Sequence, residues 1–190
     1  MRFAPMLLLA GCTPLAALLD QPLAQLARWE TASPAAIAAE PVACPAGHAA
    51  CARLHQRHAE ACMALAMGSR APGAACPGTA AHLACAAAGY AAARALEPHP
   101  MLAQGEAQAR LCLAAFLPSQ AAEEEAARAL AASTTPLNAA RAALIAGRAG
   151  TRAQRCAATL AGLRAAPPAS REAADLSRRR ASLPACGAMP

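Results

Sequence analysis

The stretch CARLHQRHAEAC, residues 51–62, gathers side chains that can bind a metal ion or exchange disulfides. At about 100° per residue on a helix, Cys51, His55, His58 and Cys62 fall within an arc of about 60°. The opposite side carries arginine, glutamine and glutamate, so the cysteine and histidine stripe is expected to face the core. Because its end cysteines are about 16 Å apart along the axis, no single ion can use all four residues.

A metal site on this stripe would use one neighbouring pair, either Cys51 with His55, His55 with His58 or His58 with Cys62, and two further ligands to close a tetrahedron. His82 is the imidazole expected nearest, so the metal alternative comprises His55, His58 and His82. The favoured interpretation is structural: the cysteines are cross-linked, the histidines line a partly wet groove, and no metal or cofactor is needed. Since imidazoles titrate near neutrality, such a groove would respond to pH.

Signatures of catalysis are missing from the sequence. It contains no phosphate-binding glycine loop, nucleophile elbow, HExxH helix, haem-attachment motif or CxxC pair. The two aspartates, Asp20 and Asp175, lie outside the expected helical core. Glutamates 123–125 come near the start of an expected helix, where their charge complements the exposed amides. We therefore expect no enzymatic activity.

The composition predicts an all-α protein. Alanine is the commonest of the 190 residues, aromatic residues make up 2%, and all 17 basic residues are arginine. Alanine is the best helix former, and the residues that favour strands are scarce. The net charge is +6, but few aromatic rings are available for base stacking, so nucleic acid is not expected as a partner.

Hydrophobic periodicity and punctuation by proline and glycine divide the chain into helices with short connections. Residues 12–47, with repeated proline and small residues, are expected to form an N-terminal segment and tether. Residues 48–164 are expected to form the helical domain, as stacked antiparallel hairpins, and residues 165–190 a C-terminal helix and tail. The expected helices cover residues 48–68, 79–97, 101–117, 120–132, 137–147, 151–163 and 170–183.

The amino terminus has an apolar run that ends in Leu9, Ala10, Gly11 and Cys12. These four residues resemble the lipobox of bacterial lipoproteins. The resemblance implies that residues 1–11 are a signal peptide and that Cys12 is lipidated and anchors the chain to a membrane. Thr13 follows it, in place of the aspartate associated with retention at the inner membrane. The implied location is the outer membrane, facing the periplasm.

Eight further cysteines remain, an even number that suits a disulfide framework in an oxidising compartment. If residues 48–68 and 79–97 form an antiparallel hairpin, Cys62 and Cys85 lie opposite each other about the turn, and we predict that they pair. Cys112 stays open as a competing partner for Cys85. The disulfide candidates are Cys44, Cys51, Cys62, Cys76, Cys85, Cys112, Cys156 and Cys186.

Residues 61–98 contain two helical patterns joined by a glycine-containing turn, with Ala86, Tyr90 and Ala93 before Pro98. This region resembles one tetratricopeptide or Sel1-type repeat, which implies a repeat-like array of hairpins. Such arrays bind other proteins, so we expect a membrane-anchored periplasmic interaction or structural protein with a protein partner. The alternative is a metal-handling or thiol-redox protein that uses the stripe of Cys51, His55, His58 and Cys62.

Overall fold

The computed structural model describes residues 20–69, 76, 78–148, 150–183 and 186. Helices form all the regular structure in these ranges, which confirms the all-α prediction, and no expected helix boundary is displaced by more than three residues. Two helices, α2 and α3, were not expected as separate elements. The helices are α2 (Gln21–Trp29), α3 (Pro34–Ala39), α4 (Cys51–Gly68), α5 (Ala80–Leu96), α6 (Pro100–Ala114), α7 (Ser119–Ala132), α8 (Pro136–Ala146), α9 (Arg152–Ala165) and α10 (Arg171–Ser182).

Local sequence explains where most helices begin. Asp20, Thr79 and Ser170 each accept a hydrogen bond from a backbone amide in the first turn of the helix that follows. Thr151 and Gln154 form a reciprocal capping box at the start of α9. Proline occupies the first turn of α2, α3, α6 and α8. It is tolerated there because a backbone N–H at this position would have no hydrogen-bond partner within the helix.

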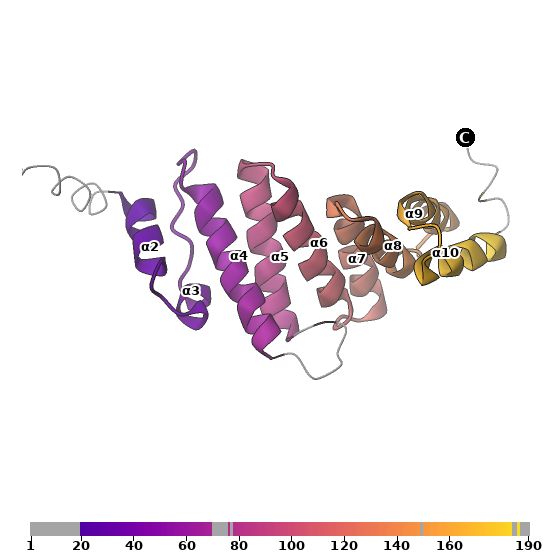
Figure 1. Ribbon diagram of the computed structural model, residues 1–190, viewed down its shortest axis with the longest axis horizontal. Helices are drawn as coiled ribbons and strands as arrows, with labels where there is room; N and C mark the ends of the chain where they lie inside the picture. The colour runs from indigo at the N-terminus through magenta and orange to yellow at the C-terminus, as the bar shows by residue number, and fades with distance from the viewer. Residues whose placement is uncertain (1–19, 70–75, 77, 149, 184–185, 187–190) are drawn as a thin grey trace, which may run out of the picture.

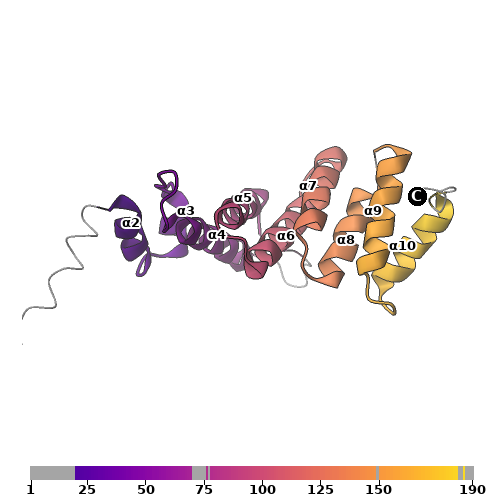
Figure 2. The ribbon, with the colours of Figure 1, turned by 90° about the horizontal axis from the view of Figure 1, so that it is seen from above.

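The helices stack as antiparallel hairpins in an elongated array. Each helix from α4 to α10 packs against the next one along the chain, and further contacts join α6 to α8 and α8 to α10. Figures 1 and 2 show α2 and α10 at opposite ends of this array. The predicted repeat-like architecture is therefore confirmed, and residues far apart in the sequence have few direct contacts.

Alanine sets the character of the core. Most buried apolar residues are alanines, and Leu54, Leu83 and Leu176 are among the few large side chains that are fully buried. A methyl side chain buries little apolar area, so each helix pair gains less from the hydrophobic effect than a leucine-rich pair would. Covalent and polar cross-links therefore carry more of the stability.

A buried ion-pair network links three successive helices. Glu106 of α6 is almost fully buried and accepts hydrogen bonds from Arg94 Nε of α5 at 2.7 Å and from Arg110 Nε at 2.8 Å. Arg110 also donates to Glu125 of α7 at 2.8 Å. Burial alone raises the pKa of Glu125, but the hydrogen bonds from Arg128 and Arg110 outweigh it and hold that pKa below its usual value. Glu125 is therefore a structural ion-pair residue as well as part of an acidic helix start.

The expectation of a tether over residues 12–47 is wrong for the part that the structure describes. Trp29 and Ile37 are 1% and 6% exposed and form one apolar cluster with Leu54 of α4. Gln25 binds the backbone of the loop after α3 through two hydrogen bonds of 2.8 Å, to Pro41 O and from Ala43 N–H. The indole N–H of Trp29 donates to Glu40, so this segment is docked by both apolar and polar contacts.

The expected boundary at residue 164 is also corrected. Helix α10 packs on both α8 and α9, and its Leu176 is fully buried beside Ala140 and Ala143 of α8. A disulfide joins Cys156 of α9 to Cys186 beyond α10. The array therefore continues without a break through α10. The expected signal peptide, residues 1–11, and the lipidation site, Cys12, lie outside the described residues.

Candidate functional site

The cysteine and histidine stripe of α4 faces the neighbouring helices, as its spacing predicts. Cys51 and Cys62 are buried, and His55 and His58 are half-buried. Arg53 on the opposite side is exposed, like Arg57. The stripe is therefore the inner face of α4.

The two cysteines of the stripe enter two different disulfides. Cys62 is joined to Cys85 of α5, with Cα atoms 5.9 Å apart, as the hairpin geometry predicts. Cys51 is joined to Cys44 in the preceding loop, with Cα atoms 5.5 Å apart. Both Cα–Cα distances lie within the range that is usual for disulfides. The cysteines of this stripe are thus cross-linking residues in the oxidised protein.

The competing pair, Cys85 with Cys112, is not formed. Cys112 of α6 is joined to Cys76 in the connection between α4 and α5, at a Cα–Cα distance of 5.2 Å. The span of this bridge, residues 76–112, overlaps that of the Cys62–Cys85 bridge, so the two cross-links together hold α4, α5 and α6. The eight candidate cysteines form four bridges in the described part of the chain.

A glycine allows α4 and α5 to approach closely at this point. A Cβ atom on Gly89 would lie 2.9 Å from Ala59 Cβ and 3.1 Å from His55 O, closer than such atoms pack. Gly89 is buried one helical turn beyond Cys85. The close crossing here is what brings Cys62 and Cys85 within bridging distance, and no sequence motif had pointed to Gly89.

His58 completes the cluster around the Cys62–Cys85 bridge. Its ring stacks on Trp29 at a centroid distance of 6.1 Å, and its Nδ1 atom lies 3.7 Å from Cys85 Sγ. One ligand atom each from His58, Cys62 and Cys85 lie within 4.8 Å of one another. These three residues would supply three corners of a tetrahedral site if the bridge were reduced.

The metal alternative named from sequence is corrected in two of its three residues. Within the described residues, the group close enough to share an ion contains His58 but neither His55 nor His82. The ring of His82 instead lies 3.2 Å from the Thr79 hydroxyl at the start of α5. His55 lies one turn before His58, where burial, and then the charge of His58, lower its pKa below the usual 6.5.

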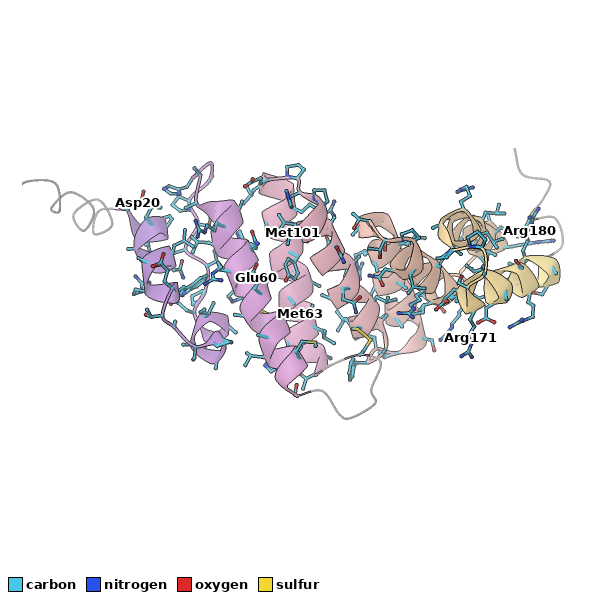
Figure 3. All side chains as sticks on the ribbon, viewed as in Figure 1. Asp20, Glu60, Met63, Met101, Arg171 and Arg180 are labelled. Carbon is cyan, nitrogen blue, oxygen red and sulfur yellow. A yellow bond between two sulfur atoms is a disulfide. The ribbon has the colours of Figure 1, made fainter. Side chains whose placement is uncertain are left out.

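A polar hollow lies on the outer side of α4. Its volume is about 550 Å³, and its walls include Arg53, Arg57 and Glu60 of α4 with Met101 and Leu102 of α6. A second hollow of about 210 Å³ lies against α2 and shares Arg53 and Arg57. Figure 3 labels Glu60 and Met101, which come from the two helices that form the larger hollow. Sequence reasoning had not predicted this surface, because it depends on how α2 packs against α4 and on where α5 places the start of α6.

The remaining polar candidates have structural partners. Asp20 caps α2 and lies 3.0 Å from His48 Nε2, next to the Cys44–Cys51 bridge. Its pKa is lowered first by the hydrogen bond from the Leu23 amide and then by His48. Asp175 forms ion pairs with Arg171 and Arg178 on α10. Both aspartates therefore have positions that explain them without catalysis.

No protein-family model, curated protein or solved structure matches this chain. Helices in the described ranges lack the combination of length and apolar character needed to cross a bilayer.

Proposed function

We propose that this chain is a membrane-anchored lipoprotein of the bacterial outer membrane whose helical array binds a partner protein in the periplasm and catalyses no reaction. The hollow between α4 and α6 is the observation that carries this proposal. Helical arrays of this kind bind partners along grooves formed by successive helices. The lipobox resemblance at Leu9 to Cys12 supports the anchor, and the four disulfides suit an oxidising compartment.

Charge and exposure in the hollow define the partner segment. Arg53 is exposed, lines both hollows and forms no ion pair among the described residues, whereas Arg57 pairs with Glu60 at 3.4 Å. Met101 is 69% exposed on the facing wall. A carboxylate beside Arg53 would pair with its charge, and an apolar side chain against Met101 would cover the exposed methionine. The proposed partner is therefore a protein segment with acidic and apolar residues close together.

Charge reversal in the hollow tests the proposal. A photo-crosslinking residue at Met101 should capture a defined envelope protein in intact cells, and Arg53→Glu with Arg57→Glu should abolish the capture. Arg128→Glu with Arg164→Glu makes the same change in charge outside the hollow and should leave capture intact. If no species is captured, or if both double variants capture it equally, the hollow is not the binding surface.

The contact between His58 and Cys85 favours a second candidate, a thiol-redox function with metal binding. A dithiol reductant would give two electrons and two protons to the Cys62–Cys85 bridge and would itself become a disulfide. The two thiols, once deprotonated, and His58 would then bind Zn²⁺, with a fourth position left for water. This function uses His58 and Cys62 of the stripe named from sequence, with Cys85 of α5 in place of Cys51 and His55.

Cobalt binding after reduction tests the second candidate. With the protein reduced by dithiothreitol and the reductant removed, Co²⁺ should produce a thiolate charge-transfer band at one equivalent, and His58→Ala should weaken binding. An absent band, or an unchanged affinity in His58→Ala, would exclude this ligand set. Cys44→Ala with Cys51→Ala is the matched control and should retain the band.

A further inference from the structure

Charge is distributed very unevenly along the chain. Residues 133–190 contain nine arginines and two acidic residues, whereas residues 20–132 contain seven arginines and nine acidic residues. A general preference for arginine over lysine does not explain this difference, because acidic residues become scarce in the same region. The last three helices of the array therefore form its strongly basic end.

Several of these arginines converge where α8 ends, α9 begins and α10 ends. Arg179 of α10 donates a hydrogen bond to Leu144 O of α8, and a Cβ on Gly147 would lie 2.8 Å from Arg179 Nη1. The Cys156–Cys186 disulfide ties the first turns of α9 to the chain beyond α10. We call the following residues the arginine cluster: Arg148, Arg152, Arg155, Arg179 and Arg180.

The acidic residues nearby are engaged elsewhere. Glu172 pairs with Arg141 at 3.0 Å, and Asp175 pairs with Arg171 and Arg178. Across the described ranges, no carboxylate forms an ion pair with a member of the arginine cluster. Among the described residues, ion pairs therefore leave the positive charge of the cluster without a neutralising partner.

Two members of the cluster, Arg179 and Arg155, show the effect of positive charge without an ion-pair partner. The pKa of Arg179 is lowered by burial and then by the charge of Arg148, with Asp175 acting in the opposite direction. The Nε atom of Arg155 is buried and has no hydrogen-bond partner among the described residues. Anionic oxygens placed against the cluster would reduce the repulsion, because guanidinium groups bind phosphate through paired hydrogen bonds.

We propose that the arginine cluster binds the phosphate groups of an anionic membrane surface. Arg148, Arg152 and Arg180 are exposed and come from three different parts of the chain, so they can contact several headgroups at once. Such basic patches are attracted to anionic bilayers. The array has too few aromatic side chains to favour single-stranded nucleic acid as the alternative polyanion.

The choice of a membrane rests on the proposed function, because a lipid anchor would keep the chain beside phospholipid headgroups. The cluster lies at the far end of the array from α2 (Figures 1 and 2), so it would supply a second attachment point. Figure 3 labels Arg180, which lies at this end of α10, and Arg171, which lies at the other. An array attached at both ends would lie along the bilayer.

Vesicle binding tests the contact without the anchor. The full chain with Cys12→Ser should sediment with vesicles of phosphatidylcholine and phosphatidylglycerol but not with phosphatidylcholine alone. Adding Arg148→Gln, Arg152→Gln and Arg180→Gln should weaken binding by roughly 100-fold, since each arginine near an anionic surface contributes about fivefold. Circular dichroism should show the same helix content in both proteins.

A matched variant removes the same charge elsewhere on the array. Arg128→Gln, Arg164→Gln and Arg171→Gln, in the same Cys12→Ser background, should leave vesicle affinity within a few-fold. Equal losses in the two triple variants, or absence of binding to anionic vesicles, would overturn the proposal. Tighter binding of single-stranded DNA than of anionic vesicles through the same three arginines would also overturn it, in favour of nucleic acid. Because Cys12 is absent throughout, these outcomes are independent of lipidation and of the hollow on α4.

Discussion

Removing the Cys62–Cys85 bridge by Cys62→Ala and Cys85→Ala should destabilise the array substantially. The bridge closes a loop with a sequence separation of 23 residues, so the loss of chain entropy from the unfolded state corresponds to about 3.4 kcal/mol. For a chain of this length, removing this stabilisation lowers the melting temperature by about 7 to 14 °C. The matched change, Cys44→Ala with Cys51→Ala, opens a separation of 7 residues and should cost about 2.4 kcal/mol.

Urea unfolding followed by far-UV circular dichroism measures both losses, and hydrogen exchange locates them. Because helices in an array contact mainly their neighbours, amide exchange should accelerate in α4 and α5 more than in α9 and α10. A loss below about 1 kcal/mol for the Cys62 and Cys85 variant would refute the entropic argument. Equal acceleration of exchange along the whole array would refute the expectation that the bridge stabilises mainly the two helices that it joins.

Three further changes test other contacts. Gly89→Leu should lower the free energy of unfolding by about 2 kcal/mol or more, because the new side chain overpacks against Ala59. Gly68→Leu is the control: nothing lies within 4 Å of its added Cβ, so its urea midpoint should change little. Glu106→Gln should cost about 2 kcal/mol, since two arginines lose their hydrogen bonds to a buried carboxylate. The exposed Glu124→Gln should leave the urea midpoint nearly unchanged, and equal midpoints for the two variants would contradict the role of the network. Because the folded pKa of His55 is lowered, the unfolded chain binds more protons, so stability should decrease as the pH falls below 6.5 and level off below the folded pKa. His55→Gln should flatten this decrease in a pH series of urea midpoints, and an unchanged slope would show that another group titrates.

Features that depend on neighbouring residues were predictable. The helix boundaries follow from proline, glycine and capping residues, as at Thr151 and Ser170, and the structure agrees with them closely. The Cys62–Cys85 pair followed from the symmetry of two helices about one turn. Such predictions need local geometry alone, which the sequence determines strongly.

Features that depend on packing between distant segments were not predictable in the same way. The proline-rich stretch around α3 suggested a tether, although Ser33 followed by Pro34 is also a helix-start signature that could have indicated the helix. Its docking depends on Trp29 and Ile37 reaching Leu54, which no spacing rule predicts. The partner of Cys112 likewise depended on the path of the connection that carries Cys76.

Mass spectrometry of the protein purified from bacterial membranes tests the proposed lipoprotein most directly. We predict that the first residue is Cys12 carrying a diacylglyceryl group, and that non-reducing peptide maps contain the four bridges, including Cys62 with Cys85. A chain that still begins at Met1, with an unmodified Cys12 and free thiols at Cys62 and Cys85, would contradict both the proposed location and the oxidised structure.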